Sequence, residues 1–292
     1  MKKLILGTDW WSDCDDAVAI RLLANAHKKG EIELLGISVD ACMEHSVQAL
    51  SAFLYDMELT DIPIGIDLEA TDFHGKAKYQ KMLCAYPSVL KSNAEAENAV
   101  SLLRRLLAQS PEKVDLIEIG FTQVFADLFD SAPDAISPLT GAQLVAEKVG
   151  TLWCMAGNWN EDGGREHNFC NNARSIDGGR RLCEKWSGEI VFLGWEVGAP
   201  VLSGGKLDKN DLLYKVLENY GCPDGRCSWD PMTALLAVTG DIEKAGYTAV
   251  RGKASLDEDG GNHFVPDENG RHTYVVKAKP DSYYADQIDE RI

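Results

Sequence analysis

The chain alternates short apolar segments with longer segments in which apolar residues recur every three or four positions. The short segments predict buried strands, and the longer ones predict amphipathic helices. The predicted strands lie at 4–6, 33–39, 63–66, 114–119, 151–155 and 190–193. The predicted helices lie at 16–23, 46–54 and 98–107, with a fourth that ends at Phe129. This β-α-β-α order predicts an α/β fold with a mostly parallel, open, Rossmann-like sheet and helices on both faces.

The segment 247–276 departs from this alternation. We expect two antiparallel strands and a loop there, followed by a short helix from about Tyr283. The loop contains the acidic turn 257–261, which lacks the glutamate and the regular oxygen spacing of an EF-hand. We therefore interpret this turn as a solvated loop.

Length and hydropathy limit the architecture. The chain has 292 residues, near the upper end for one hydrophobic core, so we expect a single domain over 1–292. No stretch of about 18 uncharged apolar residues is present, so no transmembrane helix is expected. The first apolar run, 4–6, is too short for the core of a signal peptide. These features predict a cytoplasmic protein.

Charge and cysteine content narrow the function classes. Asp plus Glu number 46 and Lys plus Arg number 29, for a formal net charge of −17. Such a charge repels nucleic acids and anionic membranes, and it suits a protein that binds a divalent cation. Solubility alone also explains most of the charge. The eight cysteines are expected to be reduced thiols, because no signal peptide is expected. Only Cys222 and Cys227 are close in sequence, and the second ligand pair that a zinc site needs is missing, so a zinc site is not expected.

Ligands of an open α/β sheet bind beyond the carboxyl ends of its strands. The segments that follow the predicted strands, or lie near them, are 9–16, 40–43, 71–76, 118–122, 156–168, 194–198 and 226–231. The first segment places four carboxylates, Asp9, Asp13, Asp15 and Asp16, within eight positions. Like charges at this density repel one another. A calcium ion, which prefers six to eight oxygen ligands, would relieve that repulsion.

Asp13 is equally well explained as the N-cap of the following helix, whereas Asp9 ends a strand and has nothing to cap. The segment 8–17, TDWWSDCDDA, is similar to the opening motif of the nucleoside hydrolases in its longer form, TDxxxDxDDA. The resemblance implies that Asp9 is both a metal ligand and the general base. It implies that Asp16 is a bidentate metal ligand and that Asp15 hydrogen-bonds a ribose hydroxyl.

Several positions depart from the family pattern or match it in part. Gly7 stands where the family often has an acid, and Trp10 and Trp11 replace smaller residues, which narrows the site. After the second strand the family usually has an asparagine that contacts the sugar, and Met43 stands at that position. His74 precedes a glycine, as in the family loop that lines the base pocket, and it is equally well explained as a surface histidine.

The segment 117–123, IEIGFTQ, resembles the strand end whose backbone carbonyl binds the metal in the family. The matching carbonyl belongs to Glu118, within one residue. A backbone oxygen does not depend on the side chain, so a glutamate is tolerable at this position. Thr122 is more simply explained as the cap of the next helix.

The segment that follows the strand 151–155 resembles the sugar-binding loop of the family, with an asparagine and then a Glu-aromatic-Asn triplet. The resemblance implies that Asn160, Glu166 and Asn168 hold the sugar hydroxyls. Mixed donors and acceptors suit hydroxyl groups, which both donate and accept hydrogen bonds. Asn158 competes with Asn160 for its role, and His167, which replaces the aromatic residue, is expected to pack.

Near the end of the chain, Trp229 and Asp230 precede a proline and a predicted helix. Asp230 resembles the last metal ligand of the family, with a helix N-cap as the alternative. Pyrimidine-acting members carry a histidine before this aspartate as the acid for the leaving group. Purine-acting members carry a tryptophan, so the resemblance implies that Trp229 stacks on a purine. A core aromatic is the alternative for Trp229.

Taken together, the resemblance implies calcium-dependent hydrolysis of the N-glycosidic bond of a purine ribonucleoside, by a protein that forms dimers or tetramers. Two rivals stay open. One is a magnesium-dependent phosphohydrolase that uses an N-terminal aspartate, although no phosphate-binding glycine loop is present. The other is a sugar-binding member of the same fold that is non-catalytic or has another substrate, as Met43 suggests.

Overall fold

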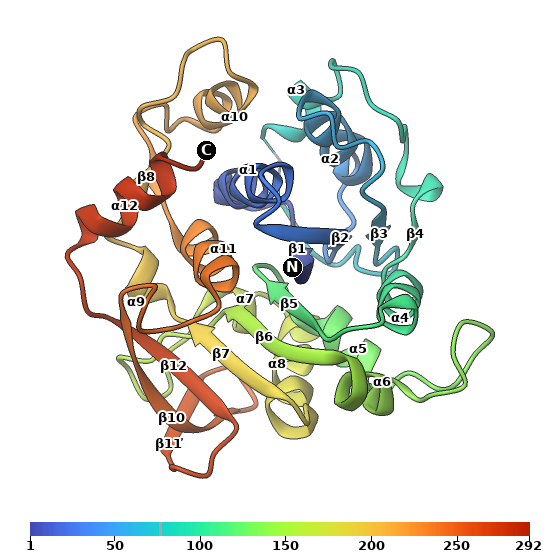
Figure 1. Ribbon diagram of the computed structural model, residues 1–292, viewed down its shortest axis with the longest axis vertical. Coiled ribbons are helices and arrows are strands. Elements are labelled where there is room, and N and C mark those ends of the chain that lie inside the picture. Colours follow the sequence, from blue (N-terminus) through green and yellow to red (C-terminus); the bar gives the residue numbers. More distant parts are fainter. Residues whose placement is uncertain (76–77) are drawn as a thin grey trace.

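The computed structural model describes residues 1–75 and 78–292. Within these residues the main sheet has ten strands in the order β11-β10-β12-β7-β6-β5-β1-β2-β3-β4 (Figure 1). The strands are β1 (Lys2–Thr8), β2 (Ile32–Val39), β3 (Ile64–Ile66), β4 (Glu97–Asn98), β5 (Val114–Glu118), β6 (Val149–Met155), β7 (Glu189–Leu193), β10 (Tyr247–Leu256), β11 (Asn262–Pro266) and β12 (His272–Lys277). Two short strands, β8 (Leu202–Ser203) and β9 (Arg226–Cys227), pair separately.

Helices cover both faces of the sheet (Figure 1). The helices are α1 (Asp15–Lys28), α2 (Ser46–Asp56), α3 (Gln80–Leu83), α4 (Ala99–Gln109), α5 (Gln123–Asp130), α6 (Gly141–Lys148), α7 (His167–Cys170), α8 (Ala173–Lys185), α9 (Trp195–Gly198), α10 (Leu212–Tyr220), α11 (Trp229–Thr239) and α12 (Asp281–Asp289), with a 3₁₀ turn at Asn93–Glu95. Because successive strand residues point to opposite faces, Leu4 and Leu6 join one hydrophobic core and Ile5 joins the other. The predicted open sheet between two helical layers is confirmed.

The segment from residue 247 onward differs from the expectation. Three strands form there instead of two: β10 pairs antiparallel with both β11 and β12, and β12 runs parallel to β7. The extra strand lets this segment extend the main sheet, which is mostly parallel, as predicted, with antiparallel pairs only at β10. The acidic turn is a closed solvated loop, since a carboxylate oxygen of Asp257 accepts the N–H groups of Asp259 (2.9 Å) and Gly261 (2.8 Å). No helix in the described parts of the chain has the length and apolarity to cross a membrane.

The strand order reverses at β1, which pairs in parallel with β2 on one side and with β5 on the other. In open α/β sheets the crevice at such a switch point is where ligands bind. The backbone segments that follow β1 and β5 approach closely there: a Cβ atom added to Gly120 would lie 2.2 Å from the backbone nitrogen of Asp9. Only a glycine after β5 therefore lets the turn after β1 take its place.

A methyl group at Gly120 should separate the ends of β1 and β5, because the atoms that it meets belong to the backbone of Asp9 and Thr8. We expect Gly120→Ala to lower the free energy of unfolding by about 1–3 kcal/mol, measured by urea denaturation. Gly188→Ala is the comparator, since its methyl meets only the side chain of Trp186, at 3.1 Å. Equal losses for the two variants would contradict the close approach.

Candidate active site

A cavity of about 360 Å³ opens beyond the carboxyl ends of β1, β5 and β6, within the range of small-molecule sites. Its lining comes from the turns after these strands, from the start of α9, from the end of α10 and from the start of α11. Seven of the residues predicted from the sequence line it: Asp9, Asp15, Asp16, Glu166, Asn168, Trp229 and Asp230. Segments more than 200 residues apart thus converge at the switch point of the sheet.

The turn between β1 and α1 has an unusual backbone. Trp10 (φ 51°) and Ser12 (φ 65°) adopt left-handed conformations that non-glycine residues rarely take. Such a conformation costs about 1–3 kcal/mol at each residue. Burial of the Trp10 indole against Phe53 (5.6 Å between ring centroids) and Tyr79 (5.3 Å) offsets this cost. The Trp10 carbonyl also accepts a hydrogen bond from Gln80 Nε2 (2.7 Å). The tryptophan therefore anchors the turn that carries the aspartates.

Asp9 and Asp16 are each held through one carboxylate oxygen. Oδ1 of Asp9 accepts the backbone N–H of Trp11 (2.8 Å). Oδ1 of Asp16 accepts the N–H of Trp10 (3.2 Å) and the hydroxyl of Thr8. Within the described residues, the second oxygen of each carboxylate has no hydrogen bond and is free for a ligand in the cavity.

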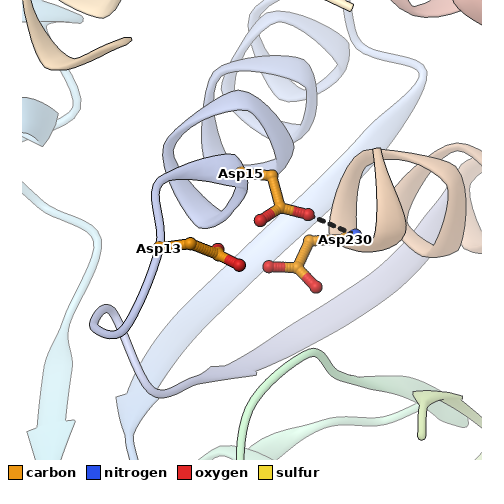
Figure 2. Close-up of side chains that lie close together, drawn as sticks. All are labelled: Asp13, Asp15 and Asp230. Atoms are coloured by element: carbon orange, nitrogen blue, oxygen red, sulfur yellow. Dashed lines mark hydrogen bonds between the residues drawn. The ribbon is translucent and has the colours of Figure 1, made fainter. Parts of the chain in front are cut away.

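Asp13, Asp15 and Asp230 point their carboxylates toward one another (Figure 2). One oxygen from each lies within 4.8 Å of the others. Oδ2 of Asp15 accepts the backbone N–H of Asp230 (3.1 Å), and Oδ2 of Asp13 accepts from Arg226 Nη2 (2.9 Å). The first turn of the chain and the N-terminus of α11 are thereby joined through acidic side chains.

The alternative roles as helix caps are wrong for both aspartates. Helix α1 begins at Asp15 and its N-cap position is Cys14, so Asp13 precedes the cap and turns toward Asp230. Helix α11 begins at Trp229, which puts Asp230 in its first turn rather than at the cap. Thr122 does occupy the N-cap position of α5, but its hydroxyl makes no capping hydrogen bond.

Burial and mutual repulsion disfavour the charged forms of these carboxyls. Burial first, and then the neighbouring aspartates, raise the pKa values of Asp9, Asp15 and Asp230 well above their usual range. Burial, with repulsion from Asp13, raises the pKa of Asp16 to about 8. A buried set of hard oxygen donors with little compensating positive charge suits a divalent cation such as calcium.

Glu166 and Asn168 form the wall next to the acids. The oxygens of the buried Glu166 accept the N–H groups of Gly157 (3.0 Å) and Asn168 (3.0 Å), and its burial raises its pKa to about 7. Nδ2 of Asn168 donates to the carbonyls of Met155 (2.9 Å) and Ile119 (3.3 Å). These bonds fix both side chains where they face the cavity.

The side chain of Glu118 is buried behind the cavity and does not line it, whereas the next residue, Ile119, does. Oε1 of Glu118 accepts the N–H of Gly120 (2.7 Å), and Oε2 would lie 2.5 Å from a Cβ atom on Gly7. The Glu118 carboxyl therefore occupies the space that a side chain at position 7 would need. Burial raises the pKa of Glu118 to about 8, and the carboxyl of Asp40 lies beside it. The absence of a side chain at Gly7 thus makes room for an acid from β5.

Two predicted residues are not brought to the cavity. Asn160 and His74 are exposed and do not belong to its lining, and neither does Asn158, whose backbone is paired with Asn262. Met43 lies in a neighbouring hollow.

Two aromatic walls stand above the acids. In one, Nε1 of Trp229 donates to the carbonyl of Trp195 (2.8 Å), and the guanidinium of Arg226 lies 5.1 Å from the Trp229 ring and 5.3 Å from the Tyr220 ring. Next to Tyr220, Cys222 Sγ lies 3.4 Å from Cys14 Sγ, so the end of α10 packs on the acidic turn.

The other wall is a row of rings. The ring of Phe121 is stacked on Phe73 (4.0 Å between ring centroids, 10° between planes), Trp11 lies 6.2 Å from Phe73, and His167 lies 5.7 Å from Phe121. Trp11 and His167 reach the cavity lining. Aromatic side chains of this kind stack on flat aromatic ligands.

The cavity also has lining residues that were not predicted from the sequence as site residues, among them His167, Trp195 and Tyr220. His167 packs against Phe121, as expected, and its partly exposed side chain also lines the cavity. Trp195 directly follows β7, in a segment that the strand-end rule had indicated. Tyr220 ends α10, and no local pattern marks a helix end as part of a site on the sheet.

No protein-family model matches this chain, and no curated protein matches it. Solved structures do resemble it over their full length. A plant nucleoside hydrolase, the PpNRh1 enzyme, has 18% identity and a TM-score of 0.75, with 99% of this chain and 98% of that chain covered. The inosine-uridine preferring nucleoside hydrolase from Bacillus anthracis has 18% identity and a TM-score of 0.68, with 100% of both chains covered. A purine-preferring ribonucleoside hydrolase from Gardnerella vaginalis has 17% identity and a TM-score of 0.73, with 99% and 98% covered.

Ca²⁺ should stabilise the protein more at high pH than at low pH. A carboxyl whose pKa is raised on folding contributes stability while it is protonated, and this contribution is lost as the pH rises through its folded pKa, about 8 for Asp16. A bound cation reverses the loss, because the ligands bind as carboxylates. We expect the increase in Tm on Ca²⁺ addition, relative to EDTA, to be larger at about pH 8.5 than at about pH 6. At a free Ca²⁺ concentration 100-fold above Kd, the unfolding free energy should rise by about 2.7 kcal/mol.

The matched controls are NaCl at equal ionic strength and the variant Asp16→Asn, which removes one carboxylate from the cavity. An increase in Tm that is the same at both pH values, or that NaCl reproduces, would show that screening rather than cation binding stabilises the protein.

Proposed function

We propose that this chain, which has the nucleoside hydrolase fold, hydrolyses the N-glycosidic bond of a purine ribonucleoside with the help of a bound calcium ion. One observation carries the proposal: carboxylates from the first turn and from α11 meet at the floor of a cavity whose walls are aromatic. The floor suits a cation and a polyhydroxyl sugar, and the walls suit a flat base.

The ligands of the cation would be Asp9, Asp16 and Asp230, with a backbone carbonyl at the end of β5, from Glu118 or from Ile119. The free oxygens of Asp9 and Asp16 and the raised pKa values of the buried carboxyls support this assignment. Calcium fits better than magnesium because it accepts more oxygen ligands in less regular geometry. When bound, such an ion lowers the pKa of a water molecule and so makes it a better nucleophile.

The other steps of the reaction are assigned to side chains that line the cavity. Asp9 accepts the proton of the attacking water as general base. Asp15, Glu166 and Asn168 orient the ribose hydroxyls, which supplies proximity to the reacting carbon. The C1′–N bond breaks through an oxocarbenium-like transition state, as in glycoside hydrolysis in general. The electron pair of that bond goes to the base, and the hydroxyl from water ends on the sugar.

The aromatic walls support a purine. The Trp229 indole is fixed by its hydrogen bond to Trp195 and by Arg226 over its face, so it offers a rigid stacking surface. The position is not a histidine, which is the residue that pyrimidine-acting members of the family carry there. For a larger, two-ring base, stacking supplies more of the binding free energy.

The magnesium-dependent phosphohydrolase is disfavoured. No lysine or arginine belongs to the lining among the described residues, and five aspartates do. A phosphate monoester would therefore find no basic side chain in the lining to pair with, whereas a neutral nucleoside needs none. Self-association into dimers or tetramers stays a prediction.

A nucleoside panel with Ca²⁺ tests the activity. We expect the release of free base and reducing sugar from purine ribonucleosides, and the loss of this release in EDTA. The variant Asp9→Asn should lower kcat by about 10²–10⁴, because it removes the general base while keeping the side-chain shape. Absence of base release from every nucleoside, in a protein that binds Ca²⁺, would instead favour a sugar-binding role without catalysis.

Removal of the stacking surface should weaken the interaction with the base and leave the groups that activate water in place. We expect Trp229→Ala to lower kcat/KM for purine nucleosides by roughly 5- to 150-fold, as expected for about 1–3 kcal/mol of stacking. Tyr55→Ala removes an exposed aromatic side chain outside this cavity, and as the control it should leave kcat/KM unchanged. An equal loss for Tyr55→Ala and Trp229→Ala would contradict the stacking role.

A further inference from the structure

Hydrolysis of a purine nucleoside needs a proton at the leaving base as well as a nucleophile at the sugar. A purine leaves far more readily when a ring nitrogen is protonated, because the electron pair of the broken bond is then neutralised. Trp229 does not supply this proton: an indole N–H is not acidic, and here it donates to the carbonyl of Trp195 (2.8 Å). The proton donor must therefore be another residue of the cavity or the solvent.

His167 is suitably placed to donate it. Its side chain is exposed and lines the cavity that also holds Asp9 and Trp229. The residue sits between Glu166 and Asn168, whose side chains are buried and fixed by hydrogen bonds, so its backbone position is well defined. His167 thus belongs to the same short segment as Glu166 and Asn168, the two residues proposed to orient the ribose.

The other titratable groups of the cavity are less suited to donate a proton to the base. The aspartates form the floor on the sugar side, and Glu166 uses both oxygens to accept backbone N–H groups. Burial raises the pKa of Tyr220 from its usual value near 10, which makes the phenol a weaker acid. Of the described lining residues, only His167 ordinarily titrates near neutral pH.

The surroundings of His167 act on its pKa in two directions, with the lowering effect of burial the larger. Its ring lies 5.7 Å from Phe121, and Asn171 Nδ2 lies 3.2 Å from Nε2. The protein around the ring lowers its pKa, while the carboxylate of Asp13, on the turn after β1, acts in the opposite direction. Glu166 is the neighbouring carboxyl on its own segment, and the packed residues Phe121 and Asn171 are uncharged. A general acid is most effective when its pKa lies near the working pH.

We propose that His167 is the acid that protonates the leaving purine, a step that rests on the proposed function. The C1′–N9 bond breaks with its electron pair going to the purine ring, and the imidazolium of His167 gives its proton to a purine nitrogen. The attacking water gives its hydroxyl to C1′ and its proton to Asp9. Solvent then returns a proton to His167 and removes one from Asp9, so the sum is nucleoside plus water to base plus ribose.

The test compares two leaving groups. Inosine needs a proton on the departing base, whereas p-nitrophenyl β-ribofuranoside releases a stable anion without one. We expect His167→Phe, which keeps an aromatic ring in the wall, to lower kcat/KM for inosine by about 100-fold or more. For the p-nitrophenyl riboside we expect a change of less than about threefold. His45→Phe, at the start of α2 and outside this cavity, is the matched control and should change neither value.

The pH profile gives a second readout. In the unaltered protein the ratio of kcat/KM for inosine to that for the p-nitrophenyl riboside should fall as the pH rises through the pKa of His167, because only the imidazolium donates. Titration of the carboxylates affects both substrates and cancels in the ratio. In the His167→Phe variant the ratio should not depend on pH.

The outcomes separate the two proposals. Equal losses for both substrates in His167→Phe, or a ratio that keeps its pH dependence in the variant, would overturn the role of His167 and leave the nucleoside hydrolase activity standing. No turnover of either substrate by the unaltered protein with Ca²⁺ would overturn the activity itself, and the role of His167 with it.

Discussion

The structure depends on holding several carboxyl groups close together in a buried site. Asp9, Asp15, Asp16 and Asp230 are all buried, and burial and repulsion raise their pKa values. Burying several carboxylates side by side costs free energy, and a bound cation that attracts them compensates for this cost. The surrounding elements are arranged accordingly: a central strand ends at the site, a strained turn is anchored by Trp10, and a glycine lets the next strand approach.

Charge and apolar surface are separated within one cavity. The carboxylates of Asp13, Asp15 and Asp230 cluster together, and the rings of Trp11, His167, Tyr220 and Trp229 line the same cavity. This separation matches a ligand with a polar, hydroxyl-rich part and a flat, aromatic part, and it is unsuited to an anion. The Arg226 side chain links the two regions, since it binds Asp13 and also lies over the rings of Trp229 and Tyr220.

The site differs from the family pattern at particular positions. Gly7 stands where the family often has an acid, and the carboxyl of Glu118 fills the space beside it from the neighbouring strand. His167, which stands where the family pattern has an aromatic residue, adds a titratable side chain to the lining of the cavity. The fold is nevertheless shared with solved structures of only 17–18% identity.

The sequence by itself determined the alternation of the first strands and helices, the open sheet, and the strand ends at which the acids lie, because these follow from local periodicity and from the rule for open sheets. Only the tertiary structure decided which groups meet. Asp13 lies next to Asp230, and Tyr220, at the end of α10, lines the cavity. Asn160 and His74 lie outside the cavity. The C-terminal segment forms three strands instead of two. The physical reason is that contacts between residues far apart in the chain depend on strand pairing and on the packing of turns, which no local pattern encodes.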